Sequence, residues 1–235
     1  MNVIVTSGHT SEPIDRVRIL ANHSTGELGQ KIAHELALRS VRVDYVYGGH
    51  RPQKKRGYIN QIEIKTFQDL EETLHNLFTT KRIDAIIHAM AVSDYRAIGM
   101  VQEGVRVPIP NKISSDNEEL TLVFAKNKKL ISQFKAWSPK TILVGFKLLV
   151  DVSEAELLAT AEASMKKNKA DLLVANDLCD ISPDHHDAFI LEKGEVAWLS
   201  TKQDIANHLA IRVKALYEGK KHKGVRIDET YLTRG

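Results

Sequence analysis

The clearest chemical signal in the sequence lies between an apolar run at residues 2–6 and the helix-like pattern that follows it. Free backbone N–H groups at the start of a helix, together with the helix dipole, favour an anion. Arg18 and Asn22, just upstream of that start, favour phosphate or a nucleotide as the anion. Ser24 and Glu27 also have the spacing of a capping box, so a plain surface helix is the competing interpretation.

A glycine pattern in the same stretch nearly matches the fingerprint of dinucleotide-binding folds. Gly26 and Gly29 occupy its second and third glycine positions, and Ser24 replaces the first glycine. The fingerprint requires a tight turn directly from a strand, whereas this pattern lies far beyond the strand end expected at Ser7. We therefore expect no NAD and no flavin at this site.

Three further loops carry candidate binding residues, because open α/β sheets bind ligands beyond the carboxyl ends of their strands. After the apolar run at residues 84–92, Asp94 can hold a metal bound to phosphates or a ribose hydroxyl, although a turn residue is the plainer interpretation. Lys112 is either a solvated lysine or part of a flap that reaches a triphosphate. Phe146 ends a strand and can stack on a base. The basic run at residues 166–169 also fits a helix C-terminus that needs no ligand.

Other motifs favour no site. The Asp-His-His-Asp run at residues 184–187 has metal-competent side chains, but it lacks the spacing of a zinc site and predicts a turn. Tyr217 and Lys221 have the spacing of a short-chain reductase motif, yet they span a helix end and a basic tail. Cys179 has no neighbouring cysteine and no feature of a nucleophile.

The composition is that of an ordinary globular protein, with 43% hydrophobic and 27% charged residues and a net charge of +3. A single cysteine excludes an internal disulfide. The first apolar run is too short for a signal peptide or a membrane span. We expect a cytoplasmic protein with one domain over residues 1–235, and neither a nucleic acid nor a membrane as partner.

Short apolar runs alternate with helical patterns along the chain, which predicts an α/β fold with a Rossmann-like, doubly wound, mostly parallel sheet. A hairpin around Lys193 and Gly194 predicts an antiparallel edge. The first helix should start near Thr25, and residues 220–223 should form a solvated tail. The expected strands are residues 2–6, 41–46, 62–64, 84–92, 120–124, 141–146 and 171–174, and the other expected helices are residues 67–78, 127–136, 153–169 and 202–217.

Together these loops resemble phosphopantothenate–cysteine ligase, the phosphopantothenoylcysteine synthetase of coenzyme A synthesis. The resemblance is an ordered series rather than one motif, and the chain looks like the monofunctional bacterial form. The matching segments are Thr6–Asp15 (TSGHTSEPID), Arg18–Gly26 (RILANHSTG), Ala91–Arg96 (AVSDYR), Lys112–Ser115 (KISS), Val144–Phe146 (VGF) and Ala170–Asp177 (ADLLVAND).

The resemblance implies a two-step reaction with Mg²⁺. The carboxylate of 4′-phosphopantothenate attacks the α-phosphate of a nucleoside triphosphate, which is expected to be CTP rather than ATP, and expels pyrophosphate. The amine of L-cysteine then attacks the acyl-nucleotide and releases the nucleoside monophosphate. It also implies a homodimer, because the arginine that Arg18 matches reaches the substrate phosphate across a dimer interface.

The resemblance assigns roles to individual residues. Asn22 and Lys112 match catalytic residues, Asn22 for the second step and Lys112 at the reacting phosphorus. Those implied to bind phosphopantothenate are Arg18, Asn22, Ser24, Thr25, Gly26 and Ala91. Those implied to bind the nucleotide are Gly8, Thr10, Met90, Ala91, Asp94, Lys112, Phe146, Lys167 and Lys169, with Asp94 also the metal candidate.

Three departures from the family pattern are visible. Lys147 and two leucines follow Phe146 where small or acidic residues are usual, and Met90 replaces a common alanine. Asn168 replaces a lysine, so Lys167 or Lys169 is expected to substitute for it. The competing hypotheses are a nicotinamide-dependent reductase and a catalytically silent nucleotide-binding regulator.

Overall fold

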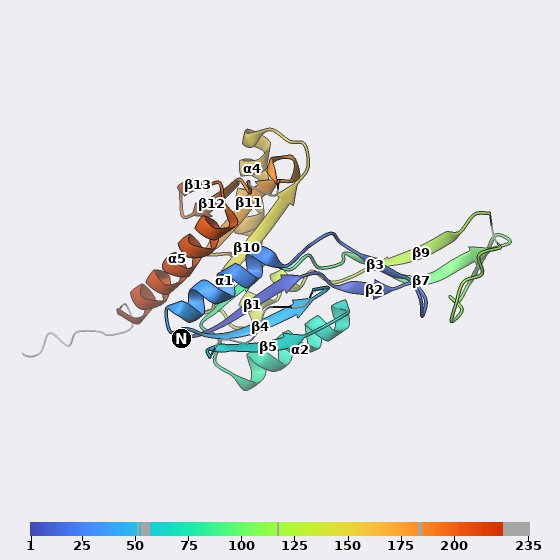
Figure 1. Cartoon of the computed structure of the whole chain (residues 1–235), viewed down its shortest axis with the longest axis horizontal. Helices are drawn as coiled ribbons and strands as arrows, with labels where there is room; N and C mark the ends of the chain where they lie inside the picture. The colour runs from blue at the N-terminus through green and yellow to red at the C-terminus, as the bar shows by residue number, and fades with distance from the viewer. Residues whose placement is uncertain (51, 53–56, 117, 183–184, 223–235) are drawn as a thin grey trace, which may run out of the picture.

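An eight-stranded sheet forms the centre of the protein in the computed structural model, which describes residues 1–50, 52, 57–116, 118–182 and 185–222 (Figure 1). Its strands are β1 (Asn2–Gly8), β4 (Arg42–Gly48), β5 (Ile59–Glu63), β6 (Ala85–His88), β10 (Ile142–Leu149), β11 (Leu172–Asp177), β12 (Ala188–Glu192) and β13 (Glu195–Leu199). The parallel part runs β5-β4-β1-β6-β10-β11. This is the 3-2-1-4-5-6 strand order of the Rossmann fold. The hairpin of β12 and β13 extends it as the predicted antiparallel edge.

Helices cover both faces of this sheet, which explains why its central strands are apolar at consecutive positions. On one face, α1 (Glu27–Leu38) packs on β1, and α5 (Lys202–His222) packs on α1 and β10, in one core that includes Val3 and Val5. On the other face, α2 (Phe67–Thr80) packs on Ile4. The helix α4 (Glu154–Asn168) packs through Leu157 and Ala161 against β11 and β12. The predicted doubly wound α/β fold is confirmed.

An arm of antiparallel strands projects from the carboxyl edge of the sheet, toward which the arrowheads of β1 and β4 point (Figure 1). It contains a hairpin of β2 (Ser11–Pro13) and β3 (Ile19–Ala21) and a three-stranded sheet in the order β8-β7-β9. The strands of that sheet are β7 (Tyr95–Gln102), β8 (Val105–Val107) and β9 (Thr121–Lys126). The arm therefore consists of two insertions, one after β1 and one after β6.

The arm corrects two sequence predictions. The apolar run at residues 120–124 was expected in the central sheet but forms part of β9, because an apolar run predicts a strand without saying which sheet it joins. The helix expected at residues 127–136 is only a 3₁₀ turn (Leu130–Ser132) followed by the one-turn α3 (Phe134–Trp137). Pro139 disfavours helical backbone at the residue before it, so α3 ends there.

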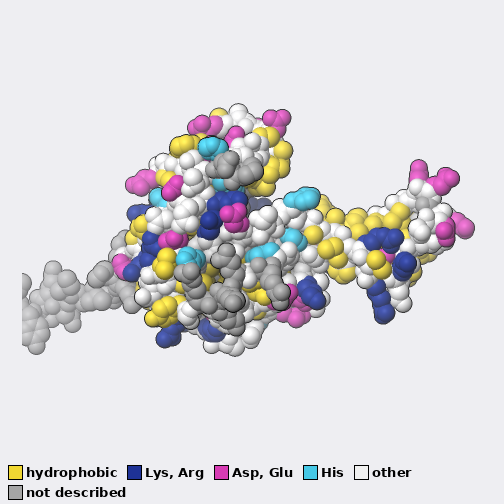
Figure 2. Space-filling view, viewed as in Figure 1, with side chains coloured by type: hydrophobic (Ala, Val, Ile, Leu, Met, Phe, Trp, Pro, Cys, Tyr) yellow, Lys and Arg dark blue, Asp and Glu magenta, His cyan; other side chains and the backbone are white. Residues whose placement is uncertain are grey.

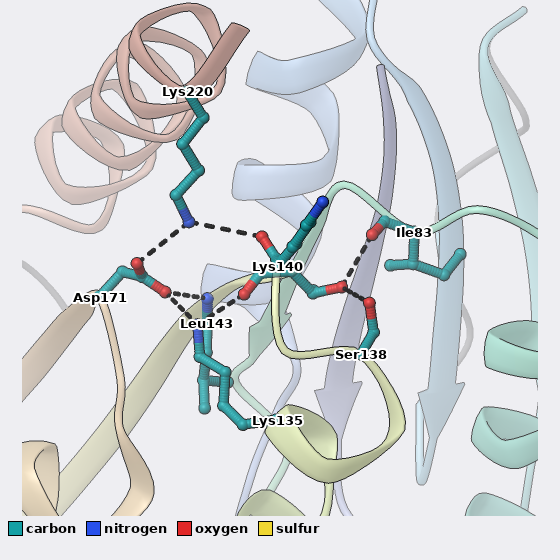
Figure 3. Close-up of polar contacts among 8 residues, drawn as sticks. Ile83, Lys135, Ser138, Lys140, Leu143, Asp171 and Lys220 are labelled. Carbon is teal, nitrogen blue, oxygen red and sulfur yellow. Dashed lines mark hydrogen bonds and ion pairs between the residues drawn. The ribbon is translucent and has the colours of Figure 1, made fainter. Parts of the chain in front are cut away.

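The start of α1 and the end of α5 also differ from the sequence prediction. The first helix begins at Glu27 rather than near Thr25, and its N-cap is Gly26 in a left-handed conformation with no side-chain cap, so the capping box is absent. The residues 220–222, expected in a solvated tail, belong to α5, and residue 223 lies outside the described residues. The Lys220 ammonium lies 3.2 Å from an Asp171 carboxylate oxygen (Figure 3).

Candidate functional site

The chain segments that follow β1 and β6 run side by side at the middle of the carboxyl edge. The Ala91 N–H donates to the Gly8 carbonyl at 2.8 Å, and the Thr10 N–H donates to the Ala91 carbonyl at 3.2 Å. From here one segment leads to α1 on one face of the sheet, and the other leads through the arm toward α3 on the opposite face. This is the topological switch point, where open α/β sheets bind ligands.

Three glycines bring the start of α1 against the end of β1. Gly8 and Gly26 have φ of +78° and +72°, which glycine adopts without strain. A Cβ on Gly29 would lie 2.4 Å from the Ser7 hydroxyl oxygen, so Gly29 permits close helix–strand packing. Gly8 is thus the spatial first glycine of the dinucleotide pattern, and the β2–β3 hairpin is inserted between it and Gly26. The sequence analysis missed this arrangement because the hairpin places Gly8 far from Gly26 along the chain.

The His50 ring packs against this glycine turn. Its Nδ1–H donates to the Gly48 carbonyl at 3.1 Å, and its Nε2 lies 2.9 Å from the Tyr45 hydroxyl. A Cβ on Gly26 would lie 2.2 Å from the nearest ring atom. His9 makes a similar contact with the adjoining backbone, since its Nδ1 lies 3.1 Å from the Ser24 carbonyl. Neither packing role was predicted from the sequence, because no local pattern marks it.

The Met90–Ala91 segment is held from beneath by buried polar side chains. The Thr6 hydroxyl accepts from the Met90 N–H at 3.3 Å and lies 2.9 Å from Nδ1 of His88. Burial lowers the pKa of His88 to about 4, so this imidazole is neutral near pH 7. Thr10 is fully buried, and its hydroxyl donates to the Ser93 hydroxyl and accepts from the Ser93 N–H. Thr10, which was predicted to bind nucleotide, is therefore buried beneath the loop, where its side chain fixes the position of Ser93.

Asn22 lies against the same loop from the side of the arm. Its side-chain amide is 3.5 Å from the Val92 carbonyl, and the side chain is exposed. Asp94 follows two residues after Val92, is exposed, and forms an ion pair with Lys129. Asn22 and the segment from Ala91 to Asp94 therefore lie next to each other at the switch point, with Asn22 and Asp94 exposed.

Asp15 connects the arm hairpin to the Lys112 segment. Its carboxylate accepts from the Ile113 N–H at 3.0 Å and from the Arg18 guanidinium at 2.6 Å. The hydrogen bond from Ile113 N–H, with others from the Val17 and Arg18 backbone, holds the pKa of Asp15 well below its usual range. Arg18 and the exposed Lys112 are thereby fixed on adjoining segments of the arm.

Sequence comparison places the chain in a known family. A family profile described as the DNA/pantothenate metabolism flavoprotein C-terminal domain matches residues 1–217. The chain belongs to this family. The bifunctional coenzyme A biosynthesis protein CoaBC of Thermococcus kodakarensis is 30% identical over 210 residues, which are 88% of this chain and 49% of that protein. The chain thus spans about half the length of the curated relatives it matches.

Solved structures support the same assignment. The DNA/pantothenate metabolism flavoprotein of Streptococcus pneumoniae superposes with a TM-score of 0.84 at 36% identity, covering 92% of this chain and 99% of that one. A Cab2 mutant in complex with phosphopantothenate-cysteine superposes with a TM-score of 0.74 at 15% identity, covering 95% of this chain and 89% of that one. At that identity the likeness concerns the fold alone.

The residues predicted to bind the nucleotide do not all lie at the same edge of the sheet. Phe146 is half-buried in the carboxyl half of β10 and packs on the face that α1 and α5 cover. Lys167 and Lys169 stand at the end of α4, which returns the chain to the amino end of β11. The topology does not bring these lysines to Gly8, Ala91 or Asn22, because a crossover helix ends at the edge opposite the one where it starts.

The opposite edge has features of its own that lie away from the candidate site. A cavity of about 630 Å³ opens there, lined by residues that include Arg42, Asp44, Tyr58 and Lys81. Asp171 lies at the same edge, between Lys135 and Lys220 (Figure 3). No helix in the described part of the chain is both long and apolar enough to cross a bilayer.

Proposed function

We propose that the protein catalyses the ligase step of coenzyme A biosynthesis that joins 4′-phosphopantothenate and L-cysteine. The observation that carries this proposal is the assembly at the switch point, where Asn22 lies against Val92 and the neighbouring Ala91 is hydrogen-bonded to Gly8 of the glycine turn. The family match and the CoaBC relatives support the same step. In our proposal the reaction takes place in the cytoplasm.

The mechanism has two steps, because a carboxylate and an amine at neutral pH form a salt rather than an amide. The pantothenate carboxylate attacks the α-phosphate of CTP, or of ATP, and pyrophosphate leaves. The cysteine amine then attacks the acyl carbon, loses a proton, and displaces the nucleoside monophosphate. With both partners held at one site, positioning and charge stabilisation supply most of the rate enhancement.

The residues of the site have complementary roles in this scheme. Backbone N–H groups at Gly26 and the start of α1 receive phosphate. The Lys112 ammonium stabilises the negative charge that develops at the reacting phosphorus. The Asn22 amide both donates to and accepts from the acyl-nucleotide, which holds it for the second step. Phe146 contributes an aromatic face for the base.

Mg²⁺ would enter with the triphosphate and neutralise part of its charge. No group of three or more His, Cys, Asp or Glu side chains suited to a metal occurs among the residues that the structure describes. This fits Mg²⁺, which typically uses one or two carboxylates and otherwise binds water and substrate phosphates. Asp94 is the carboxylate that we assign to it.

We further propose a homodimer formed through the arm. Hydrophobic side chains run along the arm in Figure 2, and several are strongly exposed, including Val17, Ile19 and Val105 at 61–67%. Exposed apolar surface of this kind favours a protein interface. Pairing of arms would carry Arg18 of one copy toward the site of the other, where its guanidinium binds the phosphate of phosphopantothenate.

A pyrophosphate-release assay tests the proposed function. Purified protein with 4′-phosphopantothenate, L-cysteine, Mg²⁺ and CTP should release pyrophosphate continuously, and the rate with ATP gives the base preference. The variant Asn22→Ala should release about one equivalent per site and then stop. If no pyrophosphate is released with either CTP or ATP, the ligase function is refuted and the silent regulator is favoured. Steady turnover by Asn22→Ala would refute the role of Asn22.

A nicotinamide-dependent reductase remains the alternative that the three glycines favour. In that case NADH or NADPH would bind and be consumed with a carbonyl substrate. Fluorescence titration with both cofactors separates this alternative from the ligase, which should bind CTP or ATP instead.

A further inference from the structure

Two neighbouring, half-buried side chains outside the assembly above each carry one buried polar atom that has no hydrogen-bond partner. They are Nδ1 of His186 and one carboxylate oxygen of Asp187, and they are the side-chain atoms with this property in the described ranges 1–50, 52, 57–116, 118–182 and 185–222. An unpaired buried polar atom costs free energy, so native proteins keep few of them, and each calls for an explanation. The sequence pattern predicted only a turn here.

The strand register places both residues at the carboxyl edge of the sheet. Ala175 of β11 pairs with Phe189 of β12 on one side and with Lys147 of β10 on the other. Because β12 is antiparallel to β11, the residues just before it lie beyond the carboxyl end of β11. The His186 N–H donates to the Ser200 carbonyl at 2.8 Å, which fixes the backbone at this position. Phe146 comes from the same edge.

The start of α1 lies close to the pair. The Lys202 ammonium bridges to the Glu27 carboxylate at 2.5 Å, and Glu27 is the first residue of α1, next to Gly26. Burial lowers the pKa of His186, and the nearby Lys202 lowers it further, whereas Glu27 and Asp187 act in the opposite direction. His186 is therefore neutral near pH 7, and the pair adjoins the helix start to which the proposed function assigns phosphate.

We infer that His186 and Asp187 form the subsite for a primary amine or ammonium group of a substrate. A carboxylate only accepts hydrogen bonds, and a neutral imidazole has one accepting nitrogen. Two adjacent acceptors match a nitrogen that carries at least two hydrogens. The inference rests on the proposed function, in which two substrates carry such a group: the α-amine of L-cysteine and the exocyclic amine of the nucleobase.

Ligand-induced thermal stabilisation tests the subsite independently of turnover. Asp187→Asn keeps the size of the side chain and removes its charge, and Asp180→Asn makes the same change at an exposed position nearby. Without ligand, Asp187→Asn should melt at the wild-type temperature or higher, because an unsatisfied charge is removed. A merely structural role would lower the melting temperature instead.

Measurements with different ligands distinguish the nucleobase amine from the L-cysteine amine. Hydrogen bonds to a charged group contribute about 1.5–3 kcal/mol, so Asp187→Asn should weaken binding by about ten- to a hundredfold. If the base is the ligand, the loss appears with CTP and not with UTP, which lacks the amine. If L-cysteine is the ligand, the loss appears in the KM for L-cysteine and not in nucleotide binding. Either result supports the subsite.

Variants at His186 provide a second measurement. His186→Asn keeps a polar atom near the position of Nδ1, and His186→Gln moves it to the position of Nε2, so the first should retain more affinity than the second. Unchanged CTP binding and unchanged KM for L-cysteine in Asp187→Asn, with a lowered melting temperature, would overturn the subsite. If the wild type binds CTP but releases no pyrophosphate, the proposed function fails while the nucleotide arm still tests the subsite.

Discussion

Replacement of Gly26 by alanine should destabilise the protein through two separable effects. The first is backbone strain, because a left-handed conformation costs a residue with a Cβ about 1–2 kcal/mol. The second is a clash, since the new Cβ would lie 2.2 Å from the His50 ring. Moving that ring breaks its hydrogen bonds to Tyr45 and Gly48, each of which contributes about 0.5–1.5 kcal/mol.

We expect a total loss of about 2–5 kcal/mol in the free energy of unfolding. For a chain of this size, 1 kcal/mol shifts the melting temperature by about 2–4 °C, so Gly26→Ala should melt roughly 4–20 °C below the wild type. Circular dichroism melts measure this shift. Gly104→Ala is the matched control, because Gly104 also has positive φ, at +76°, but a Cβ added there would have no atom within 4 Å. It should show the strain alone.

The double variant Gly26→Ala/His50→Ala isolates the clash. Removing the ring should relieve the contact, so the double variant should lose about 1–3 kcal/mol less than the two single variants predict together. Strict additivity would refute the idea that His50 packs against this turn. A loss in Gly26→Ala no larger than in Gly104→Ala would refute it as well.

Three further predictions concern charge, catalysis and assembly. Asp171→Asn should lower the melting temperature by several degrees at pH 7. Burial raises the pKa of Asp171, but the hydrogen bonds from Lys135 and the Leu143 N–H, with the charges of Lys135 and Lys220, together outweigh burial and leave the pKa below the ordinary 3.8. The stabilisation is present above the unfolded pKa and is lost as the pH falls through the lower folded value, so the melting temperatures of the variant and the wild type should converge between pH 7 and pH 2. Lys112→Ala should slow pyrophosphate release about 100-fold or more with little change in the melting temperature, and a normal rate would contradict its assigned role. Ile19→Asp should shift the protein from dimer to monomer in analytical ultracentrifugation and lower activity with it, whereas an unchanged dimer would place the interface elsewhere.

The central sheet could be predicted from sequence because its strands are buried on both faces. A run such as Val3–Val5 has no other stable environment in a chain of this composition, and the alternation with helices sets the strand connections. The arm could not be predicted in the same way. Its strands are half-exposed, and segments such as β7 carry glycine and polar residues that resemble a loop.

The position of part of the candidate site could also be predicted, because it directly follows strands that are buried on both faces. The position of Ala91 at the carboxyl edge could be predicted, because Ala91 follows a buried strand and the ends of parallel strands share one edge of the sheet. Contacts that depend on the arm, such as Asp15 with Ile113, join segments far apart in the sequence and leave no local pattern. His50 and the pair at residues 186–187 are likewise defined only by tertiary packing.

The β2–β3 hairpin is inserted between Gly8 and Gly26 in such a way that its length and sequence do not affect the order of the core strands. Its ends already meet, since the Ser7 hydroxyl donates to the Gly26 carbonyl at 2.8 Å, so the sheet registers are independent of what lies between them. The hairpin can therefore change in length and sequence without altering the order of the core strands. Replacing residues 9–25 with a short turn would test this directly: the sheet should fold, with the compact turn of an ordinary dinucleotide-binding protein and without the ligase site.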